Sequence, residues 1–216
     1  MSDTYDGLAL FSGGLDSILA CRVLADQGRR ILGLHFTSPF FGHPDRLDFW
    51  RAEYGVEAVC VDIADEFTAL LTAGPPDGFG KDLNPCVDCK ILMLRRARAL
   101  MPRYGARFLI SGEVLGQRPM SQRRDTLGRI RIRAGVDDVL VRPLSAHKLP
   151  ETAPERDGRV DRARLLGLWG RGRNEQMRLA REVYGFSKFP QPGGGCALTD
   201  GPQVARFWNV LDRAAA

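Results

Sequence analysis

The feature that most constrains this chain is a glycine-rich hexapeptide near its start, Ser12-Gly13-Gly14-Leu15-Asp16-Ser17. An apolar run, residues 8–11, precedes it, and a helical pattern over residues 18–24 follows it. Glycines allow the backbone to approach a ligand closely, and the free N–H groups of a helix start point toward that ligand. The segment therefore predicts a phosphate site between a strand and a helix, with Asp16 and the two serines capping the helix or contacting phosphate and metal. No Gly-Lys-Ser/Thr follows, so the segment is not a Walker P-loop.

Apolar segments alternate with helical patterns through the first two thirds of the chain. Strands are expected at residues 7–11, 31–36, 57–63, 107–111 and 139–142, and helices at 17–27, 44–54, 65–72 and 86–104. This alternation predicts an α/β fold, a doubly wound parallel sheet with helices on both faces. Ligands of such sheets bind at the carboxyl ends of the strands, where the Ser12 and Gly112 segments fall. After residue 143 we expect a short helical extension, with helices at 161–168, 174–184 and 203–213.

Charge is distributed unevenly along the 216 residues. Residues 1–90 hold 7 Lys and Arg against 14 Asp and Glu, whereas residues 91–216 hold 24 against 12. Of the 31 basic residues 27 are Arg, which suits bidentate contacts with phosphate. The basic half is therefore a candidate polyanion surface. A general preference for Arg on solvated helix faces is the alternative. Trp50, Trp169 and Trp208 can stack on bases, although core packing is the more common role.

The chain start resembles no signal peptide, and no apolar run approaches the roughly 20 residues that span a bilayer. We therefore expect a cytoplasmic protein without a membrane partner. In that compartment the five cysteines are not expected to form a disulfide framework. Cys21 and Cys60 occur in apolar segments and are expected to be small core residues.

Three further cysteines stand in distinctive surroundings. Cys86 and Cys89 share one face of a predicted helix start, where the helix N-terminus and Lys90 are expected to favour thiolates. Cys196 follows three glycines, residues 193–195. Three cysteines without an evident fourth ligand suit a [4Fe–4S] cluster with one open iron, whereas a structural zinc site is usually closed by four ligands. His43 or His147 could complete a zinc site, but surface or core roles are more common for such histidines.

The hexapeptide resembles the SGGxDS loop of the PP-loop ATP pyrophosphatases, and the Ser12 loop, Cys86-x-x-Cys89 and the terminal Gly-Gly-Cys196 occur in the same order in PP-loop tRNA thiolases. Residues 111–117 followed by Ser121-Gln122 are similar to a segment of the tRNA 4-thiouridine synthetases. Asn84-Pro85 and the cysteines also resemble the tRNA 2-thiouridylases. Persulfide-using 2-thiouridylases carry Asp where Cys86 stands, so this chain is more similar to the three-cysteine, cluster-dependent subtype. The 4-thiouridine synthetases usually carry an N-terminal RNA-binding module, whereas this chain starts at the catalytic domain.

The resemblance implies an adenine nucleotide alpha hydrolase-like fold, with a PP-loop domain at residues 1–145 and an extension at 146–216 that carries the third cysteine. It implies that ATP and Mg²⁺ adenylate a uridine carbonyl oxygen of tRNA, and that sulfur then displaces AMP. The cysteines would hold the cluster and act catalytically together with Asp16. The implied catalytic residues are Asp16, Cys86, Cys89 and Cys196, and the three cysteines are also the implied cluster ligands. The implied nucleotide-binding residues are Ser12, Gly13, Gly14, Asp16, Ser17, Phe36, Gly112, Glu113 and Gln117.

Alternatives remain open at this point. Cys196 could carry the sulfur as a persulfide, with Cys86 or Cys89 releasing it as a disulfide forms, and no cluster. The site could bind zinc or no metal. The chain could be an ATP-dependent enzyme that transfers sulfur to, or amidates, a small molecule. It could also be a non-catalytic RNA-binding scaffold. The expected partners are tRNA and a sulfur donor, either sulfide or a cysteine desulfurase system, and a homodimer is possible.

Overall fold

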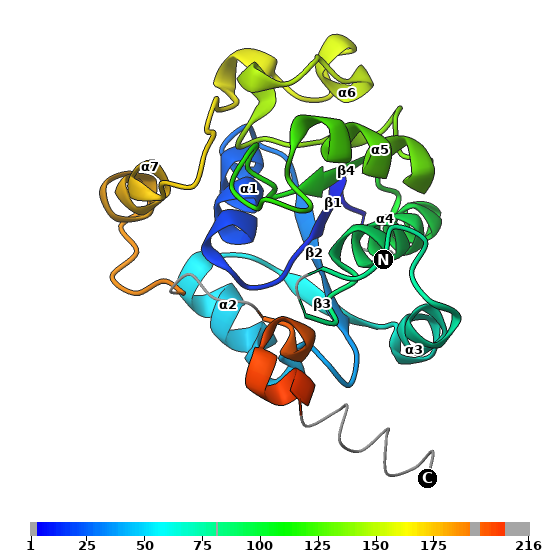
Figure 1. Cartoon of the computed structure of the whole chain (residues 1–216). Coiled ribbons are helices and arrows are strands. Elements are labelled where there is room, and N and C mark those ends of the chain that lie inside the picture. The colour runs from blue at the N-terminus through cyan, green and yellow to red at the C-terminus, as the bar shows by residue number, and fades with distance from the viewer. Residues whose placement is uncertain (1–3, 81, 191–194, 206–216) are drawn as a thin grey trace, which may run out of the picture.

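A five-stranded parallel sheet forms the centre of the protein (Figure 1). The computed structural model describes residues 4–80, 82–190 and 195–205. The strand order is β3-β2-β1-β4-β5. The strands are β1 (Gly7–Leu10), β2 (Ile31–Thr37), β3 (Ala58–Asp62), β4 (Phe108–Ser111) and β5 (Leu140–Val141). The predicted doubly wound α/β fold is confirmed, and the order reverses between β1 and β4, where such sheets bind ligands.

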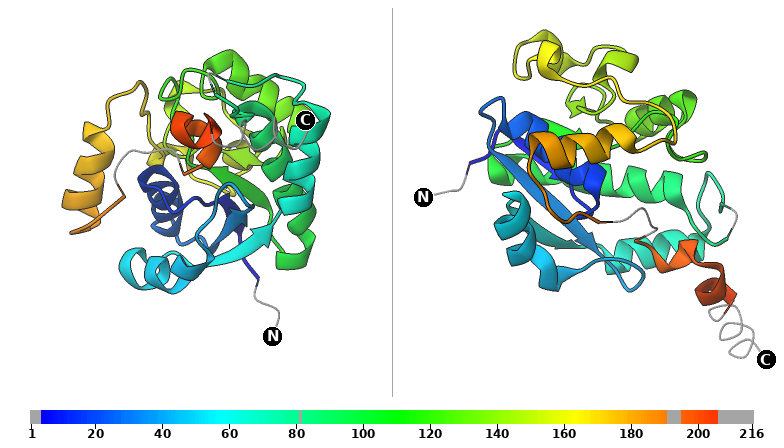
Figure 2. Two further views of the ribbon diagram at one scale, coloured as in Figure 1. Left: turned by 60° about the horizontal axis from the view of Figure 1, so that its bottom comes forward. Right: turned by 90° about the vertical axis from the view of Figure 1, so that its left-hand side faces the viewer.

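Residues of one strand contribute to two separate cores because successive side chains point to opposite faces of the sheet. Leu8 and Leu10 belong to one apolar cluster, whereas Ala9 belongs to the other. Helices α1 and α2 cover one face of the sheet, and α3, α4 and α5 lie on the other (Figures 1 and 2). The helix bounds are α1 (Leu15–Ala25), α2 (Leu47–Tyr54), α3 (Ala64–Ala73), α4 (Cys86–Leu100) and α5 (Arg124–Ala134).

The part of the chain after β5 is less regular. It contains α6 (Ala153–Arg156), a 3₁₀ turn at Arg162–Arg164, and α7 (Asn174–Arg178), which continues as a π-helical turn at Leu179–Val183. The predicted helix at 174–184 therefore has nearly the right extent. A helix begins at residue 201, so residues 203–205 of the helix expected at 203–213 are helical, and those from 206 on lie outside the described residues.

The helix expected at residues 161–168 is wrong. Only the 3₁₀ turn is helical there, and the chain then runs extended beside the segment that follows β5. Leu166 donates its N–H to the carbonyl of Pro143 at 2.9 Å, and Leu168 donates to that of Leu144 at 2.7 Å. These backbone groups thus find partners on a distant segment instead of within a helix. Conversely α5 was not expected, although Leu127, Ile130 and Ala134 form its buried stripe.

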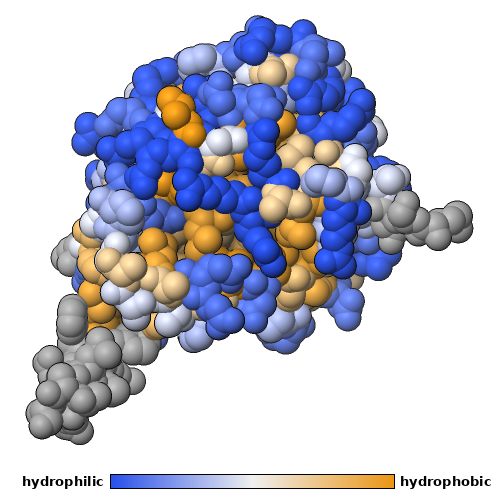
Figure 3. Space-filling view, turned by 90° about the vertical axis from the view of Figure 1, so that its right-hand side faces the viewer, coloured by the Kyte–Doolittle hydropathy of each residue, from blue (hydrophilic) through white to orange (hydrophobic). Residues whose placement is uncertain are grey.

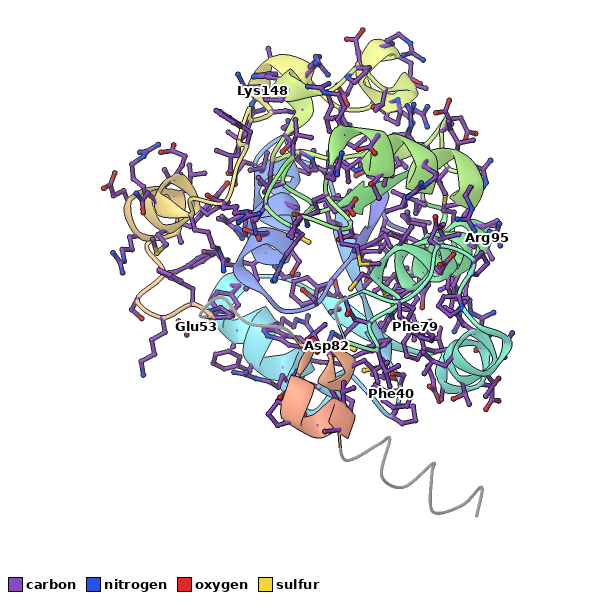
Figure 4. The ribbon with its side chains drawn as sticks, in the orientation of Figure 1. Phe40, Glu53, Phe79, Asp82, Arg95 and Lys148 are labelled. Atoms are coloured by element: carbon purple, nitrogen blue, oxygen red, sulfur yellow. The ribbon has the colours of Figure 1, made fainter. Side chains whose placement is uncertain are left out.

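Two arginines of α4 bind α5 and the segment that follows α5, on the outer side of the sheet. Arg98 binds the carboxylate of Asp138 through both terminal nitrogens, at 2.6 and 3.1 Å. Arg95, labelled on the outer side of α4 in Figure 4, donates to the carbonyl of Arg133 at 2.8 Å. On this side of the molecule hydrophilic residues surround hydrophobic ones that reach the surface in the middle of the face (Figure 3). In the part of the chain that the structure describes, no helix is long and apolar enough to cross a bilayer.

Candidate functional site

A cavity of about 330 Å³ opens at the carboxyl edge of the sheet, between the loops that follow β1 and β4. Leu10 of β1 pairs with Ser111 of β4, so the two loops emerge side by side. A volume of this size lies within the range of small-molecule sites. The cavity is lined by every residue of the predicted nucleotide and cysteine sets except Gly13. The Ser12 and Gly112 segments, which were expected at the carboxyl ends of the strands, therefore do meet there.

The Ser12 loop holds the start of α1 in an open arrangement. Gly13 adopts a φ of +74°, and a Cβ at this position would lie 2.2 Å from the Trp50 ring. Only glycine fits there, and its role is to let the loop pack against the core. The N-cap residue of α1 is Gly14, so no side chain caps the first N–H groups of this helix. The Ser17 hydroxyl donates to the carbonyl of Gly14 at 2.8 Å and lies 3.3 Å from the Ser12 hydroxyl. The helix start is thus available to an anion.

The Gly112 loop lies in direct contact with the backbone of α1. A Cβ on Gly112 would lie 2.7 Å from the carbonyl oxygen of Asp16 and 2.9 Å from the Cα of Ser17. Any side chain there would separate the two loops. The sequence indicated glycine for approach to a ligand, and the structure adds that this glycine permits the contact between the loops that builds the site.

Asp16 connects three elements. Its Oδ2 accepts a hydrogen bond from Gln117 Nε2 at 2.7 Å, and the Oε1 of Gln117 accepts one from Gln176 Nε2 at 3.0 Å. Its Oδ1 lies 3.6 Å from a terminal nitrogen of Arg173. Gln117 therefore orients the carboxylate of the phosphate loop, and α7 completes the arrangement from the far end of the chain.

Glu113 is buried and paired. Its Oε2 accepts a hydrogen bond from Arg142 Nε at 2.9 Å, with 2% and 8% of the two side chains exposed. Burial alone would raise the pKa of Glu113, but Arg142 and Lys90 outweigh it, so this pKa lies below its usual range. In the part of the chain that the structure describes, Glu113 Oε1 has no hydrogen-bond partner. One oxygen of the predicted nucleotide-site carboxylate is thus committed to Arg142, and the Ser111 hydroxyl, which also lines the cavity, helps to hold the pKa of Glu113 low.

A buried histidine fixes the wall of the cavity beside β2. His35 Nε2 accepts a hydrogen bond from the His43 N–H at 2.8 Å, so Nδ1 carries the proton and donates to the Phe11 carbonyl at 3.0 Å. Burial lowers the pKa of His35, which favours this neutral form. The loop that His35 holds pairs in turn with the third cysteine. Phe41 forms an antiparallel bridge with Cys196, and the Phe40 carbonyl, near the C-terminal segment in Figure 4, accepts from the Ala197 N–H at 2.8 Å.

The three cysteines of the predicted set share the cavity. Cys86 and Cys89 occupy the first turn of α4, and Cys196 approaches from the loop beside β2. Asn84 Nδ2 donates to Cys86 Sγ at 3.2 Å. Among the described residues, no group of three or more His, Cys, Asp or Glu side chains is arranged to hold a metal ion. The thiols thus face one space without forming a compact ligand set.

The expectation that local charges favour thiolates is wrong for Cys89. Burial raises the pKa of this thiol to about 12, and the attraction of Lys90 only partly offsets that effect. Burial also raises the pKa of Cys196. The sequence showed the helix start and Lys90, but it could not show that Cys89 is half-buried in the wall of the cavity. Ligation of a metal deprotonates a coordinating thiol outright.

The expectations for the other cysteines, the tryptophans and His147 are partly confirmed and partly wrong. Cys21 is buried as expected, whereas a core position is wrong for Cys60, which is exposed on β3, the strand at the edge of the sheet. Trp50 packs in the core, but Trp169 is 71% exposed, so core packing is wrong for it. Trp208 lies outside the described residues. His147 donates from Nε2 to the Arg162 carbonyl at 2.8 Å and does not line the cavity.

Sequence reasoning missed the site residues that carry no motif. Arg142 follows β5 directly, so a charged residue at the carboxyl end of an apolar strand was the available signal. Arg173 and Gln176 belong to the basic C-terminal part of the chain, where nothing in the sequence separates them from surface arginines and glutamines. Only the packing of α7 against α1 brings them to Asp16.

The buried pair Glu113–Arg142 predicts a large stability effect. Glu113→Ala leaves the Arg142 charge buried and unpaired, so we expect the free energy of unfolding to fall by about 3–5 kcal/mol. Urea unfolding measures it. The control is Glu175→Ala, which breaks the exposed pair with Arg178 and should cost less than about 1 kcal/mol. Equal losses in the two variants would contradict the burial argument.

The same pair predicts a dependence of stability on pH. The folded-state pKa of Glu113 lies below the unfolded value of about 4.3, so the stabilisation is complete above about pH 5. It is lost as the pH falls through the folded-state pKa. Urea unfolding from pH 7 down to pH 3 should show the difference between wild type and Glu113→Gln shrinking toward the acidic end. A difference that stays constant with pH would contradict this assignment.

The sequence of this chain is similar to a known protein family and to several characterised proteins. A family model described as thiamine biosynthesis protein (ThiI) matches residues 3–149. A tRNA sulfurtransferase of Edwardsiella ictaluri is 32% identical over 151 residues, which are 66% of this chain and 29% of that protein. The tRNA-specific 2-thiouridylase MnmA of Nitratidesulfovibrio vulgaris is 34% identical over 122 residues, 49% of this chain and 34% of that protein. The chain thus spans about a third of the length of these relatives.

Among solved structures, a predicted subunit of tRNA methyltransferase from Methanocaldococcus jannaschii is similar with a TM-score of 0.45 and 15% identity, over 64% of this chain and 69% of that one. The family match includes the Ser12 loop, both cysteines of α4 and the Gly112 loop, and it ends before α7 and Cys196. Because this match covers more than half of the sequence, the chain belongs to the ThiI family, as its motifs indicated.

Proposed function

We propose that this protein uses ATP to activate a uridine carbonyl oxygen of tRNA and replaces that oxygen with sulfur, in the cytoplasm. One observation carries the proposal: a single cavity is lined both by the Ser12 loop and by Cys86, Cys89 and Cys196. Activation of an oxygen by a nucleotide and its displacement by sulfur require these two kinds of group at one place. Relatives named tRNA sulfurtransferase and tRNA-specific 2-thiouridylase support this substrate class.

The first step in this proposal is adenylation. The uridine oxygen attacks the α-phosphorus of ATP, an O–P bond forms, and the bond to the bridging oxygen breaks with release of pyrophosphate. The free N–H groups at the start of α1 would hold the pyrophosphate part, and the hydroxyls of Ser12 and Ser17 would turn from each other and from Gly14 to donate to it. Asp16, fixed by Gln117, would hold Mg²⁺.

The second step is displacement of AMP by a sulfur nucleophile. The carbon–sulfur bond forms as the bond from carbon to the AMP oxygen breaks, and no net oxidation occurs when the nucleophile is sulfide. Three cysteine thiols facing one cavity fit the donor chemistry of an iron–sulfur cluster. We propose Cys86, Cys89 and Cys196 as its ligands, with Asn84 donating to the Cys86 sulfur. When bound, such a cluster supplies an iron without a protein ligand, at which sulfide can be held.

A persulfide on Cys196, loaded by a cysteine desulfurase, is the competing source of sulfur. In that route Cys86 or Cys89 attacks the persulfide to release sulfur, a disulfide forms, and a dithiol reductant restores the thiols. Both routes use the same cavity, so the experiment on the cysteines must separate them.

The adenylation step predicts the products of ATP. With substrate tRNA and Mg²⁺, the protein should convert ATP to AMP and pyrophosphate, and Asp16→Asn should reduce this turnover at least about 100-fold with little change in the urea midpoint. Chromatography of labelled nucleotide measures the products. Arg178→Ala, an exposed change on α7, is the control with unchanged products and rate. Release of ADP and phosphate by the wild type would exclude the proposed function.

The cysteine set predicts metal content. Protein purified without oxygen should contain about four irons per chain, the content of a [4Fe–4S] cluster. Replacing Cys86, Cys89 or Cys196 singly by Ala should remove most of the iron, whereas Cys60→Ala, an exposed cysteine on β3, should not. Iron, sulfide and zinc analysis of the same samples makes the comparison. Full thiolation by iron-free protein would favour the persulfide route instead.

The tRNA surface that we propose differs from a general Arg-rich face, because many arginines are already used within the fold. Arg129 and Arg133 pair with Asp77, and Arg133 also binds Asp88 at 3.1 Å. Arg118 lines the cavity, Arg171 is exposed two residues before the cavity-lining Arg173, and neither has an ion pair with a described carboxylate. Exposed Trp169 bridges to Leu115 of the Gly112 loop, so an aromatic ring and two unpaired cations lie on the two segments that supply Gln117 and Arg173 to the cavity.

This surface predicts two separable effects on tRNA binding. Replacing both Arg118 and Arg171 by Ala should weaken binding and reduce the slope of log affinity against log salt by about 2, since each lost phosphate contact releases about one counterion fewer. Trp169→Ala should weaken binding about 5- to 150-fold at unchanged slope, because stacking releases no counterions. Filter binding at several salt concentrations measures both. Arg96→Ala with Arg103→Ala, on α4 and the turn that follows it, is the charge-matched control. A slope changed equally by the control pair would contradict a defined surface.

A further inference from the structure

An arginine from beyond the family-matched region stands in the candidate site. Arg173 is the N-cap residue of α7 and lines the cavity. The extended segment before it is fixed to the site, because the Gly170 N–H donates to the Leu115 carbonyl at 2.7 Å. Helix α7 and its π-helical continuation then pack beside α1, which is visible in Figures 1 and 2. Arg173 is therefore held from both sides next to the phosphate loop.

The contacts of Arg173 are incomplete although its side chain is only 14% exposed. Its nearest charged partner is Asp16 Oδ1 at 3.6 Å, which is longer than a hydrogen bond. Within the described residues, Arg173 Nε and Asp16 Oδ1 are both buried and have no hydrogen-bond partner. Buried polar atoms of native proteins are normally hydrogen-bonded, so each exception requires an explanation.

The other buried arginine of the site shows what a structural pair looks like here. Arg142 donates to Glu113 at 2.9 Å and to the Leu127 carbonyl at 3.1 Å. Arg142 thus satisfies a carboxylate and the backbone of α5, whereas Arg173 does neither. The difference indicates that Arg173 is positioned for a ligand rather than for the fold.

The chemistry of the surroundings identifies that ligand. The uncapped start of α1 attracts an anion, and the phosphate loop itself contains no lysine or arginine. A guanidinium presents a planar set of donors that matches two oxygens of a phosphate. We propose that Arg173 is a phosphate-binding residue that leaves Asp16 and donates to the pyrophosphate part of ATP, which frees Asp16 for Mg²⁺. This inference rests on the proposed use of ATP. It assigns Arg173 as the cation that balances the negative charge of the departing pyrophosphate.

The test compares ligands that share or lack the pyrophosphate part. Binding of Mg²⁺–ATP, Mg²⁺–pyrophosphate and AMP is measured by calorimetry for wild type, Arg173→Ala and Arg173→Lys. We expect Arg173→Ala to weaken ATP and pyrophosphate by about 10- to 100-fold, the usual effect of a lost hydrogen bond to a charged group, and AMP by less than about 2-fold. Arg173→Lys should fall between, because it retains the charge without the planar donors.

Arg178→Ala is the matched control, an exposed arginine of the same helix that pairs with Glu175 and Glu182, and it should leave all three affinities unchanged. Thermal unfolding of each variant checks the fold. Equal weakening of ATP and AMP by Arg173→Ala would assign it a structural role, and unchanged ATP binding would remove it from the site. Either result overturns the inference about Arg173 but leaves the proposed use of ATP intact. If the wild type itself binds neither ATP nor pyrophosphate, the proposed function fails as well, so the two failures are distinguishable.

Discussion

Two backbones meet at the carboxyl edge of the sheet with no side chain between them. Gly112 lies against the carbonyl of Asp16 and the Cα of Ser17, at distances that exclude even a methyl group. This contact depends on the parallel pairing of β1 with β4, which starts both loops at the same level. Everything that follows in the site depends on it: Gln117 reaches Asp16 and the cavity closes between the loops.

Charge in this protein has two uses that its sequence does not separate. One set of arginines holds helices together, as Arg98 does with Asp138 and Arg133 with Asp88. The other set faces the cavity or its rim without a strong partner, as Arg118 and Arg173 do. The physical difference is satisfaction of hydrogen bonds: a guanidinium that is fully used inside the fold has no donors left for a phosphate. A count of basic residues therefore overstates the surface available to RNA.

The cysteines show how burial changes chemistry that local sequence indicates. A helix start and a neighbouring lysine favour a thiolate, but removal from water penalises the charged form more, and the pKa of Cys89 rises to about 12. The free thiol of Cys89 is thus a poor nucleophile where it stands. Ligation of a metal would reverse this effect at Cys89, because it deprotonates a coordinating thiol outright. The same burial keeps His35 neutral, so that it can accept from one loop and donate to another.

Much of the molecule could be predicted from the order of its residues. Alternating apolar and helical patterns are local, and they determined the five strands, four of the sheet-covering helices and the edge at which ligands bind. The hexapeptide and the cysteine spacing are local as well, and residues carrying them do line one cavity. Helix α5 and the extended run after residue 164 were not predicted, because the former reads as a charged segment and the latter takes its hydrogen bonds from Pro143 and Leu144.

Only the tertiary structure decided the contacts between segments that are far apart in the sequence. Arg173 reaches Asp16 across the chain, Arg142 neutralises Glu113, and Cys196 arrives beside Phe41 through a bridge to the loop after β2. Exposure of Trp169 and of Cys60 belongs here too, since an apolar residue is buried only where another element covers it. Patterns in the sequence report the conformation and the facing of each element. Burial, ion pairing and the pKa values that follow from them depend on which elements pack together, and that is a property of the folded chain alone.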